Sequence, residues 1–335
     1  WFMNKALEFI NKYIDDGVVI ACSGGPDSMA LFDVLLKAGV KNIVCAHVNH
    51  KVRVESDNEA IMVKEYCLKN NVPFELYEIN EYSGSNFEAE AREKRYNFFE
   101  SVLKKYGFKY LVTAHHGDDL METILYRIVR GSSLEGYAGF KYISKRKNYT
   151  ILRPLIWYTK EKIMEYVKNN NIPYAIDLTN NNTDYLRNKF RHKVLPIYKE
   201  INKDAHLKFL QFSNILNKYD NFVNNYVNKI YPSIVSNGID ISLLLKEDDL
   251  IVDNVIYRYL ISVSSNINTK HVELVKKFIS SSKKNGIINL PGVVLERKYN
   301  KLVIFEEKGN YLYELNDYVK LNNGYVIKKI NDTLD

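Results

Sequence analysis

Six consecutive residues near the N-terminus combine small, hydroxyl and acidic side chains in a pattern suited to binding phosphate. They follow the apolar run Val18–Cys22 and precede a segment that favours a helix. Glycines let the backbone approach an anion, hydroxyl groups donate hydrogen bonds, and the start of a helix attracts negative charge. The string contains neither Gly-Lys-Ser/Thr nor Gly-x-Gly-x-x-Gly, and an ordinary strand-to-helix turn would explain only its two glycines. We predict a phosphate-binding loop made of Ser23, Gly24, Gly25, Pro26, Asp27 and Ser28.

A second group concentrates acidic residues within one turn of an expected helix. Glu122 follows Asp118 by four positions and Asp119 by three, so a helix places the carboxylates on one face. Like charges so close are costly unless a cation lies between them. Mg²⁺ and the ammonium groups of an amino-acid substrate are both candidates, while the helix dipole explains one of the acids. His115 and His116 precede them, either as packing or capping residues or as members of the same polar site.

Three further stretches carry basic and polar residues. Arg92 and Arg95 share one face of an expected helix and suit phosphate or carboxylate groups. The string His47–His50 ends an expected strand. The third stretch comprises Asp177, Asn180, Tyr185, Arg187, Asn188, Arg191 and Val194-Leu195-Pro196. Each of the three stretches by itself is more typical of a surface helix or a helix cap.

Strand and helix patterns alternate through the first half of the chain, and this alternation predicts an α/β fold. Strands separated by helices need right-handed crossovers, which give a doubly wound parallel sheet covered on both faces. Ligands bind beyond the carboxyl ends of such strands, where the motifs fall. The expected strands are Val18–Cys22, Asn42–Val48, Phe74–Ile79 and Tyr110–Thr113. The expected helices are Ser28–Leu36, Glu55–Asn70, Asn86–Tyr106 and Asp118–Arg130, the last closed by Gly131.

The pattern changes after about residue 200, which predicts a second, smaller α+β domain. A Rossmann-like domain is expected over residues 1–205 and the smaller domain over residues 206–335. The later elements are a helix over 206–230, mixed structure over 239–279, and antiparallel strands over 287–306 that turn at Pro291-Gly292 and Asn300.

Composition excludes several protein classes and indicates a polyanionic partner. The 335 residues are 46% hydrophobic and 26% charged, as in a folded chain. The three cysteines lie far apart and form no Cys-x-x-Cys, which predicts a cytoplasmic protein. The sequence contains no run of about 18 apolar residues, so no membrane partner is expected. The net charge of +7 arises within residues 141–200, which hold 13 Lys and Arg against 5 Asp and Glu, with tyrosines among them. This segment suits nucleic acid, with a solvated helix face as the plainer alternative.

The motifs together carry a family resemblance. The string Ser23–Ser28 resembles the Ser-Gly-Gly-x-Asp-Ser pyrophosphate loop of the N-type ATP pyrophosphatase (PP-loop) superfamily. With the strings at His115–Thr123 and Arg187–Arg191, the order is similar to that of the tRNA(Ile)-lysidine synthetase family, over about Val18–Pro196 and more weakly over Leu295–Phe305. The resemblance implies a ligase. ATP adenylates C2 of the wobble cytidine in an isoleucine tRNA with a CAU anticodon, pyrophosphate leaves, and free L-lysine displaces AMP to form lysidine.

The resemblance also implies roles for individual residues. The loop Ser23–Ser28 binds ATP and Asp27 helps to hold Mg²⁺, so ATP and Mg²⁺ are the expected cofactors. Arg95, His115 and Asp119 are the catalytic candidates, the first two by stabilising charge on the adenylated intermediate. Lysine binding is assigned to Asp118, Asp119, Glu122 and Arg187, and tRNA binding to Lys51, Arg53, Arg187 and Arg191.

Two alternative functions and one departure from the family pattern stand beside this interpretation. A tRNA thiolase would use the same loop with a sulfur donor, but thiolating branches depend on catalytic cysteines, and Cys22, Cys45 and Cys67 occupy expected strand or core positions. A non-catalytic tRNA-binding protein would keep the fold without turnover. Lys51 stands where family members often have glycine. Residues 206–335 are the expected tRNA-binding domain. The sequence leaves open whether two copies of the chain form a homodimer.

Overall fold

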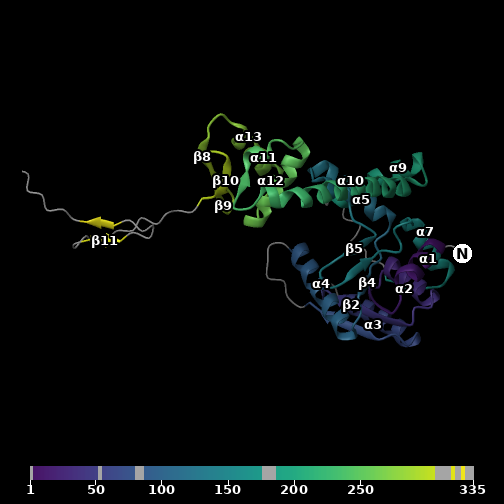
Figure 1. The fold of residues 1–335 in the computed structure, drawn as a ribbon. Helices are drawn as coiled ribbons and strands as arrows, with labels where there is room; N and C mark the ends of the chain where they lie inside the picture. The colour runs from purple at the N-terminus through teal and green to yellow at the C-terminus, as the bar shows by residue number, and fades with distance from the viewer. Residues whose placement is uncertain are drawn as a thin grey trace, which may run out of the picture. The chain divides into compact units, whose positions relative to one another are not determined.

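The computed structural model describes residues 3–51, 55–79, 87–175, 186–305, 318–320 and 326–328 (Figure 1). The chain divides into two compact units, residues 1–222 and 223–335. The division falls inside one long helix, α10 (Ala205–Ile234). The assignment of a catalytic domain to residues 1–205 and a tRNA-binding domain to residues 206–335 stays a prediction.

A mostly parallel sheet forms the centre of the first unit. Five strands run parallel in the order β3-β2-β1-β4-β6, and β5 adds an antiparallel edge to β6. The predicted α/β class and parallel sheet are confirmed, whereas the sequence analysis did not predict β5 and β6, which have three residues each. The strands are β1 (Gly17–Ala21), β2 (Asn42–Asn49), β3 (Phe74–Glu78), β4 (Tyr110–Val112), β5 (Ile143–Lys145) and β6 (Thr150–Leu152).

Helices cover both faces of this sheet, which explains the unbroken apolar sequence of β1. Val18 and Ile20 pack into a core with α1, α2 and α7, whereas Val19 packs on the other face with Phe99 of α4. All three β1 side chains are fully buried, and each burial stabilises the fold by about 1.5–3 kcal/mol. The helices are α1 (Asn4–Tyr13), α2 (Pro26–Lys37), α3 (Glu55–Lys69), α4 (Phe87–Tyr106), α5 (Gly117–Arg130), α6 (Leu134–Tyr137) and α7 (Lys160–Asn169).

Helices α2 and α5 begin one or two residues before their predicted starts because of their capping residues. Pro26 occupies the first turn of α2, where no N–H is needed. His116 caps α5, and its N–H donates to the Asp119 side chain at 3.0 Å. Gly131, with φ of 78°, follows the last turn of α5 as predicted.

Three short helices then bring basic residues alongside α5. They are α8 (Leu186–Lys189), the π-helix η2 (Phe190–Val194) and α9 (Leu195–Ile201). Buried Phe190 and Leu195 pack against Met121 of α5. This packing fixes the segment that carries Arg187 and Arg191, and π-helical turns occur often at functional sites.

In the second unit, the C-terminal part of α10 and the helices α11, α12 and α13 pack against a small antiparallel sheet of order β7-β10-β9-β8. The strands after residue 284 turn at Pro291-Gly292 and at Tyr299-Asn300, so the predicted antiparallel strands are confirmed. No described helix is both long enough and apolar enough to cross a membrane. The elements are β7 (Ile239–Asp240), α11 (Ile241–Leu244), α12 (Asp249–Val263), α13 (Thr269–Ser280), β8 (Asn285–Leu290), β9 (Val293–Lys298), β10 (Lys301–Ile304), β11 (Tyr318–Lys320) and β12 (Val326–Lys328).

A substitution at Gly238 would test how closely the backbone packs at this second sheet. Its φ is 90°, and a Cβ atom would lie 2.4 Å from the backbone oxygen of Leu302. We expect Gly238→Ala to lower the free energy of unfolding by well over 1 kcal/mol, because strain and a backbone clash add. Gly292→Ala is the control, since φ there is 74° and the nearest atom is the movable Ser264 hydroxyl at 3.1 Å. Equal losses in urea denaturation would contradict the role of the Leu302 contact.

Candidate active site at the edge of the parallel sheet

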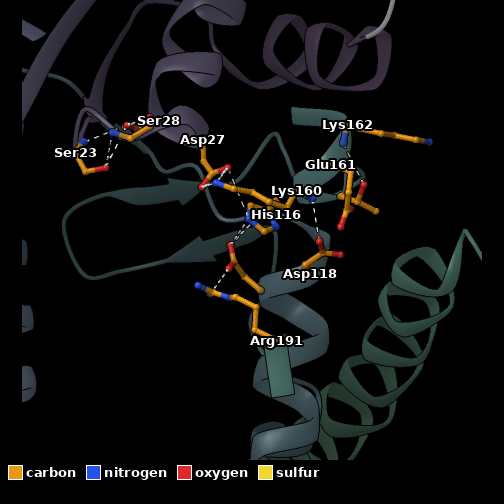
Figure 2. Close-up of polar contacts among 12 residues, drawn as sticks. Ser23, Asp27, Ser28, His116, Asp118, Lys160, Glu161, Lys162 and Arg191 are labelled. Carbon is orange, nitrogen blue, oxygen red and sulfur yellow. Dashed lines mark hydrogen bonds and ion pairs between the residues drawn. The ribbon is translucent and has the colours of Figure 1, made fainter. Parts of the chain in front are cut away.

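The residues between β1 and α2 form a tight loop held by its own hydroxyl groups. Gly24 has φ of 85°, and a Cβ atom there would lie 3.2 Å from Val63 Cγ2. The Ser28 hydroxyl donates to the Gly25 carbonyl at 2.9 Å and accepts from the Ser23 N–H at 3.2 Å (Figure 2). The loop is therefore shaped before any ligand binds, at the helix start where an anion is favoured.

Asp27 extends from the first turn of α2 and pairs with a lysine that local sequence patterns do not reveal. Nζ of Lys160 lies 2.7 and 2.6 Å from the two carboxylate oxygens of Asp27 (Figure 2). The backbone N–H of Lys160, at the start of α7, donates to Oδ2 of Asp118 at 2.9 Å. Sequence reasoning missed Lys160 because it is 133 positions from Asp27. This lysine connects the loop to the acidic helix.

His116 makes a second connection between the loop and the acids of α5. Its Nε2 lies 3.9 Å from Oδ1 of Asp27 and 3.4 Å from Oδ2 of Asp119. Burial raises the pKa of Asp119, but the nearby charges of His116, His115 and Arg191 and the bond from the His116 amide outweigh burial and hold that pKa below its ordinary value. The loop and the acidic helix therefore form one site.

Arg191 of η2 supplies a cation between two of the acids. Its Nη2 lies 2.8 Å from Oε2 of Glu122 and 3.6 Å from Oδ1 of Asp119. Nε of Arg187 lies farther away, 4.0 Å from Oε1 of Glu122. Burial raises the pKa of Glu122, with Arg191 opposing it. The predicted tRNA contacts of both arginines stay predictions, because here these side chains face the acids.

Asp118 is neutralised by another lysine that sequence reasoning missed. Nζ of Lys199, on α9, donates to Oδ2 of Asp118 at 2.6 Å and to both carboxylate oxygens of Glu161 at 2.9 Å. Asp118 is only 6% exposed, and its Oδ1 has no hydrogen-bond partner. Its contact with substrate lysine stays a prediction. A substrate amine at Asp118 would have to displace Lys199, which already binds this carboxylate.

Comparison with known proteins places this architecture in a family. The family profile described as PP-loop domain matches residues 2–198. A tRNA(Ile)-lysidine synthase of Bacillus licheniformis is 30% identical over 344 residues, which cover 93% of this chain and 72% of the relative. This chain belongs to the PP-loop tRNA(Ile)-lysidine synthase family. The tRNA(Ile)-lysidine synthase of Bacillus subtilis (strain 168) is 29% identical over 97% of this chain and 76% of its own length. The PP-loop domain identifies the chain as a user of ATP.

One solved structure shares the fold without sharing much sequence. The U34-tRNA thiolase NcsA from Methanococcus maripaludis superposes with a TM-score of 0.51 at 15% identity, over 64% of this chain and 79% of that chain. Such a likeness shows the fold alone. A sulfur-transfer site needs an accessible thiol, and here Cys22, Cys45 and Cys67 are all at most 2% exposed. Burial raises the pKa of the Cys45 thiol well above its ordinary value.

The departure from the lysidine synthase pattern at Lys51 has a conformational explanation. Lys51 has φ of 50°, in the left-handed region where glycine is favoured. Its ammonium group lies 2.9 Å from both Asp57 and Glu78, and these ion pairs hold the side chain. Its contact with tRNA stays a prediction. The other predicted positions at Arg53, Asp177, Asn180 and Tyr185 lie outside the described residues.

His115 and Arg95 lie near the same edge of the sheet. Nδ1 of His115 lies 2.9 Å from the Thr113 hydroxyl, and its ring centroid lies 5.3 Å from that of Phe140. Burial lowers the pKa of His115 to about 4, against the opposing charge of Asp119. Arg95, on α4, adds to the effect of burial in lowering the pKa of His50 at the end of β2. The lowered pKa leaves His115 neutral at pH 7. The catalytic roles assigned to Arg95 and His115 stay predictions.

The lowered pKa of His115 makes stability depend on pH. The unfolded chain binds this proton near pH 6.5, whereas the folded protein binds it only near pH 4. His115 therefore makes stability fall as the pH drops from about 6.5 to 4, with no such loss above that window. We expect His115→Asn to flatten a urea-denaturation profile there, and exposed His192→Asn to leave it unchanged. NMR titration of the His115 ring near pH 6.5 would contradict this prediction.

Proposed function

We propose that this chain is an ATP-dependent ligase that forms lysidine at the wobble cytidine of an isoleucine tRNA with a CAU anticodon, with AMP and pyrophosphate as the other products. One observation carries the proposal. His116 lies within 3.9 Å of the loop residue Asp27 and within 3.4 Å of Asp119, so an anion site and an amine site adjoin. The reaction needs both sites within reach of one pyrimidine, and family membership supports the same chemistry.

The first step uses the loop. The C2 carbonyl oxygen attacks the α-phosphorus of ATP, the new O–P bond forms, and the bond to the bridging oxygen breaks as pyrophosphate leaves. Loop N–H groups and the Ser23 and Ser28 hydroxyls hold the phosphates in position. Neutral His115 can donate a ring N–H to developing negative charge without titrating near pH 7.

Asp27 fits a Mg²⁺ ion that arrives with ATP. In the described ranges, no group of three or more His, Cys, Asp or Glu side chains is placed to hold a metal ion alone. Mg²⁺ commonly takes one or two carboxylates and completes its shell with phosphate and water oxygens, which suits a single aspartate beside the loop. Mg²⁺ would neutralise phosphate charge, and Lys160 would be released from Asp27 toward the phosphates.

The second step uses the acidic helix. Asp119 and Glu122 suit the amines of free lysine, which must replace Arg191 as their cation. The ε-ammonium group releases one proton to solvent water to become nucleophilic, the C2–N bond forms, and the C2–O bond breaks as AMP leaves with its electron pair. We assign Arg187 to the lysine carboxylate or to an RNA phosphate. The wobble base is unpaired and enters the site at modest cost.

The deciding experiment incubates the protein with labelled lysine, ATP and a transcript of the isoleucine tRNA. We expect lysine in the RNA, with AMP and pyrophosphate formed in equal amounts. A sulfur addition in place of lysine would favour the thiolase alternative, and tight tRNA binding without turnover would favour the non-catalytic one.

Replacing the loop carboxylate separates nucleotide chemistry from RNA binding. We expect Asp27→Ala or Ser28→Ala to abolish adenylation and leave the Kd for tRNA nearly unchanged, because both residues act on phosphate. Lys162→Ala, an exposed change on α7, is the control with unchanged adenylation. Pyrophosphate release and RNA binding are measured in parallel, and equal loss of both activities argues against a phosphate role.

Replacing the buried acid of α5 tests the amine site. We expect Glu122→Ala to raise the KM for lysine at least tenfold and the KM for ATP by less than threefold, because one charged contact of about 1.5–3 kcal/mol is lost. Steady-state lysine incorporation measures both constants. A larger effect on ATP would assign this carboxylate to the metal instead.

A further inference from the structure

The hairpin of β9 and β10 in the second unit turns through two residues, Tyr299 and Asn300 (Figure 1). Tyr299 has φ of 51°, in the left-handed region where two-residue hairpin turns favour glycine, asparagine or aspartate. A bulky side chain rarely takes this conformation, because its Cβ atom crowds the neighbouring backbone. The hairpin therefore carries an aromatic residue at a position where an aromatic residue is conformationally unfavourable.

Hydrogen bonds on both sides hold the turn in this conformation. The Tyr299 N–H donates to Oδ1 of Asn285 at 3.1 Å, and the Tyr299 carbonyl accepts from Nε of Arg297 at 3.3 Å. Nδ2 of Asn300 donates to Oδ1 of Asp240 at 2.8 Å. Backbone strain persists only where the surroundings fix it, and it concentrates at functional sites. Tyr299 itself is 71% exposed, so the fixed turn presents its ring to solvent.

The strand register gathers lysines at the same end of this sheet. Lys298 and Lys301 lie directly opposite each other at the base of the turn, and Lys298 also lies opposite Asn285, which follows Lys283-Lys284. All four lysines are exposed. Like charges directly opposite each other on one face of a sheet are destabilising. In the described part of the chain only Lys298 of the four has an ion-pair partner, Glu296 at 2.7 Å, so an anion would relieve the repulsion.

The other charged groups near the turn leave this positive charge in place. Asp240 lies opposite Lys301 on β7, but its Oδ1 already accepts from Asn300 and from the Leu243 N–H. Buried Arg297 adds another cation, and its Nη1 donates to carbonyl groups at the end of α13. RNA is a polyanion that suits both features, since its phosphates meet lysines and its unpaired bases stack on aromatic rings.

We propose that the tip of the β9–β10 hairpin is an RNA-binding site, in which Tyr299 stacks on an unpaired base and Lys284, Lys298 and Lys301 contact the flanking phosphates. The inference rests on the proposed function, because it takes the isoleucine tRNA as the RNA that binds. Phosphate contacts position RNA without reading its sequence, and stacking accepts any base. The site therefore contributes affinity more than it selects a sequence.

Binding of the tRNA transcript to the full chain, measured by anisotropy over a range of salt concentrations, tests the site without turnover. We expect Tyr299→Gly to weaken binding roughly fivefold or more with an unchanged slope of log K against log salt, because stacking releases no counterion. Lys301→Gln should weaken binding and reduce that slope by about 0.7–0.9. Tyr299→Phe keeps the ring and should bind like the wild type. Lys270→Gln, an exposed change at the other end of α13, is the matched control and should change neither quantity.

Stability separates a binding role of Tyr299 from a structural one. Because glycine adopts positive φ without strain, we expect Tyr299→Gly to leave the urea midpoint unchanged or to raise it while RNA affinity falls. A midpoint that falls together with RNA affinity would assign the ring to folding and overturn the stacking contact.

The remaining outcomes decide between partners. The site is refuted if Tyr299→Gly and Lys301→Gln bind tRNA like Lys270→Gln. Vesicles that contain phosphatidylglycerol test a lipid headgroup as the source of phosphate, and loss of vesicle binding with tRNA binding intact would also refute the site. Loss of tRNA binding in variants of a protein that makes no lysidine would uphold the site and reject only the ligase. Lysidine formation with unchanged tRNA binding in the variants would keep the ligase and reject the site.

Discussion

Charge compensation at the carboxyl edge of the parallel sheet is the constraint on which this site depends. Asp27 and three acids of α5 gather there, and charges a few ångströms apart interact by several kcal/mol at the effective dielectric of a protein. Lys160, Arg191 and Lys199 each contact at least one of these acids. The cations come from α7, η2 and α9, so the same ion pairs hold these elements to the sheet edge.

Under the proposed function, cationic ligands would exchange with the protein's own side chains. A lysine amine would take the place of Arg191 at Glu122, and a metal ion would take the place of Lys160 at Asp27, so the charge count of the site changes little. Removing the cation without replacement would leave the carboxylates uncompensated, which favours exchange over simple release.

Sequence predicted those parts of the site that depend on local spacing. The loop Ser23–Ser28, the shared face of Asp119 and Glu122, and the parallel strands all derive from residues close in the chain. The cations that neutralise them could not be predicted in this way, since Lys160 is 133 positions from Asp27 and Lys199 is 81 positions from Asp118. Only the tertiary fold brings them together. The strands β5 and β6 were also not predicted, and they are joined by a short hairpin turn within the basic segment.

A tRNA thiolase shares this fold at 15% identity, so the fold alone does not identify the nucleophile. An activated pyrimidine accepts whichever nucleophile the site delivers. A sulfur route needs a reachable thiol, and the three cysteines here pack in the hydrophobic core. An amine route needs carboxylates near the loop, and α5 carries them, with His116 lying between the loop residue Asp27 and Asp119. Under the proposed function, the carboxylates that would bind the amine nucleophile therefore lie on one helix, α5, which follows strand β4.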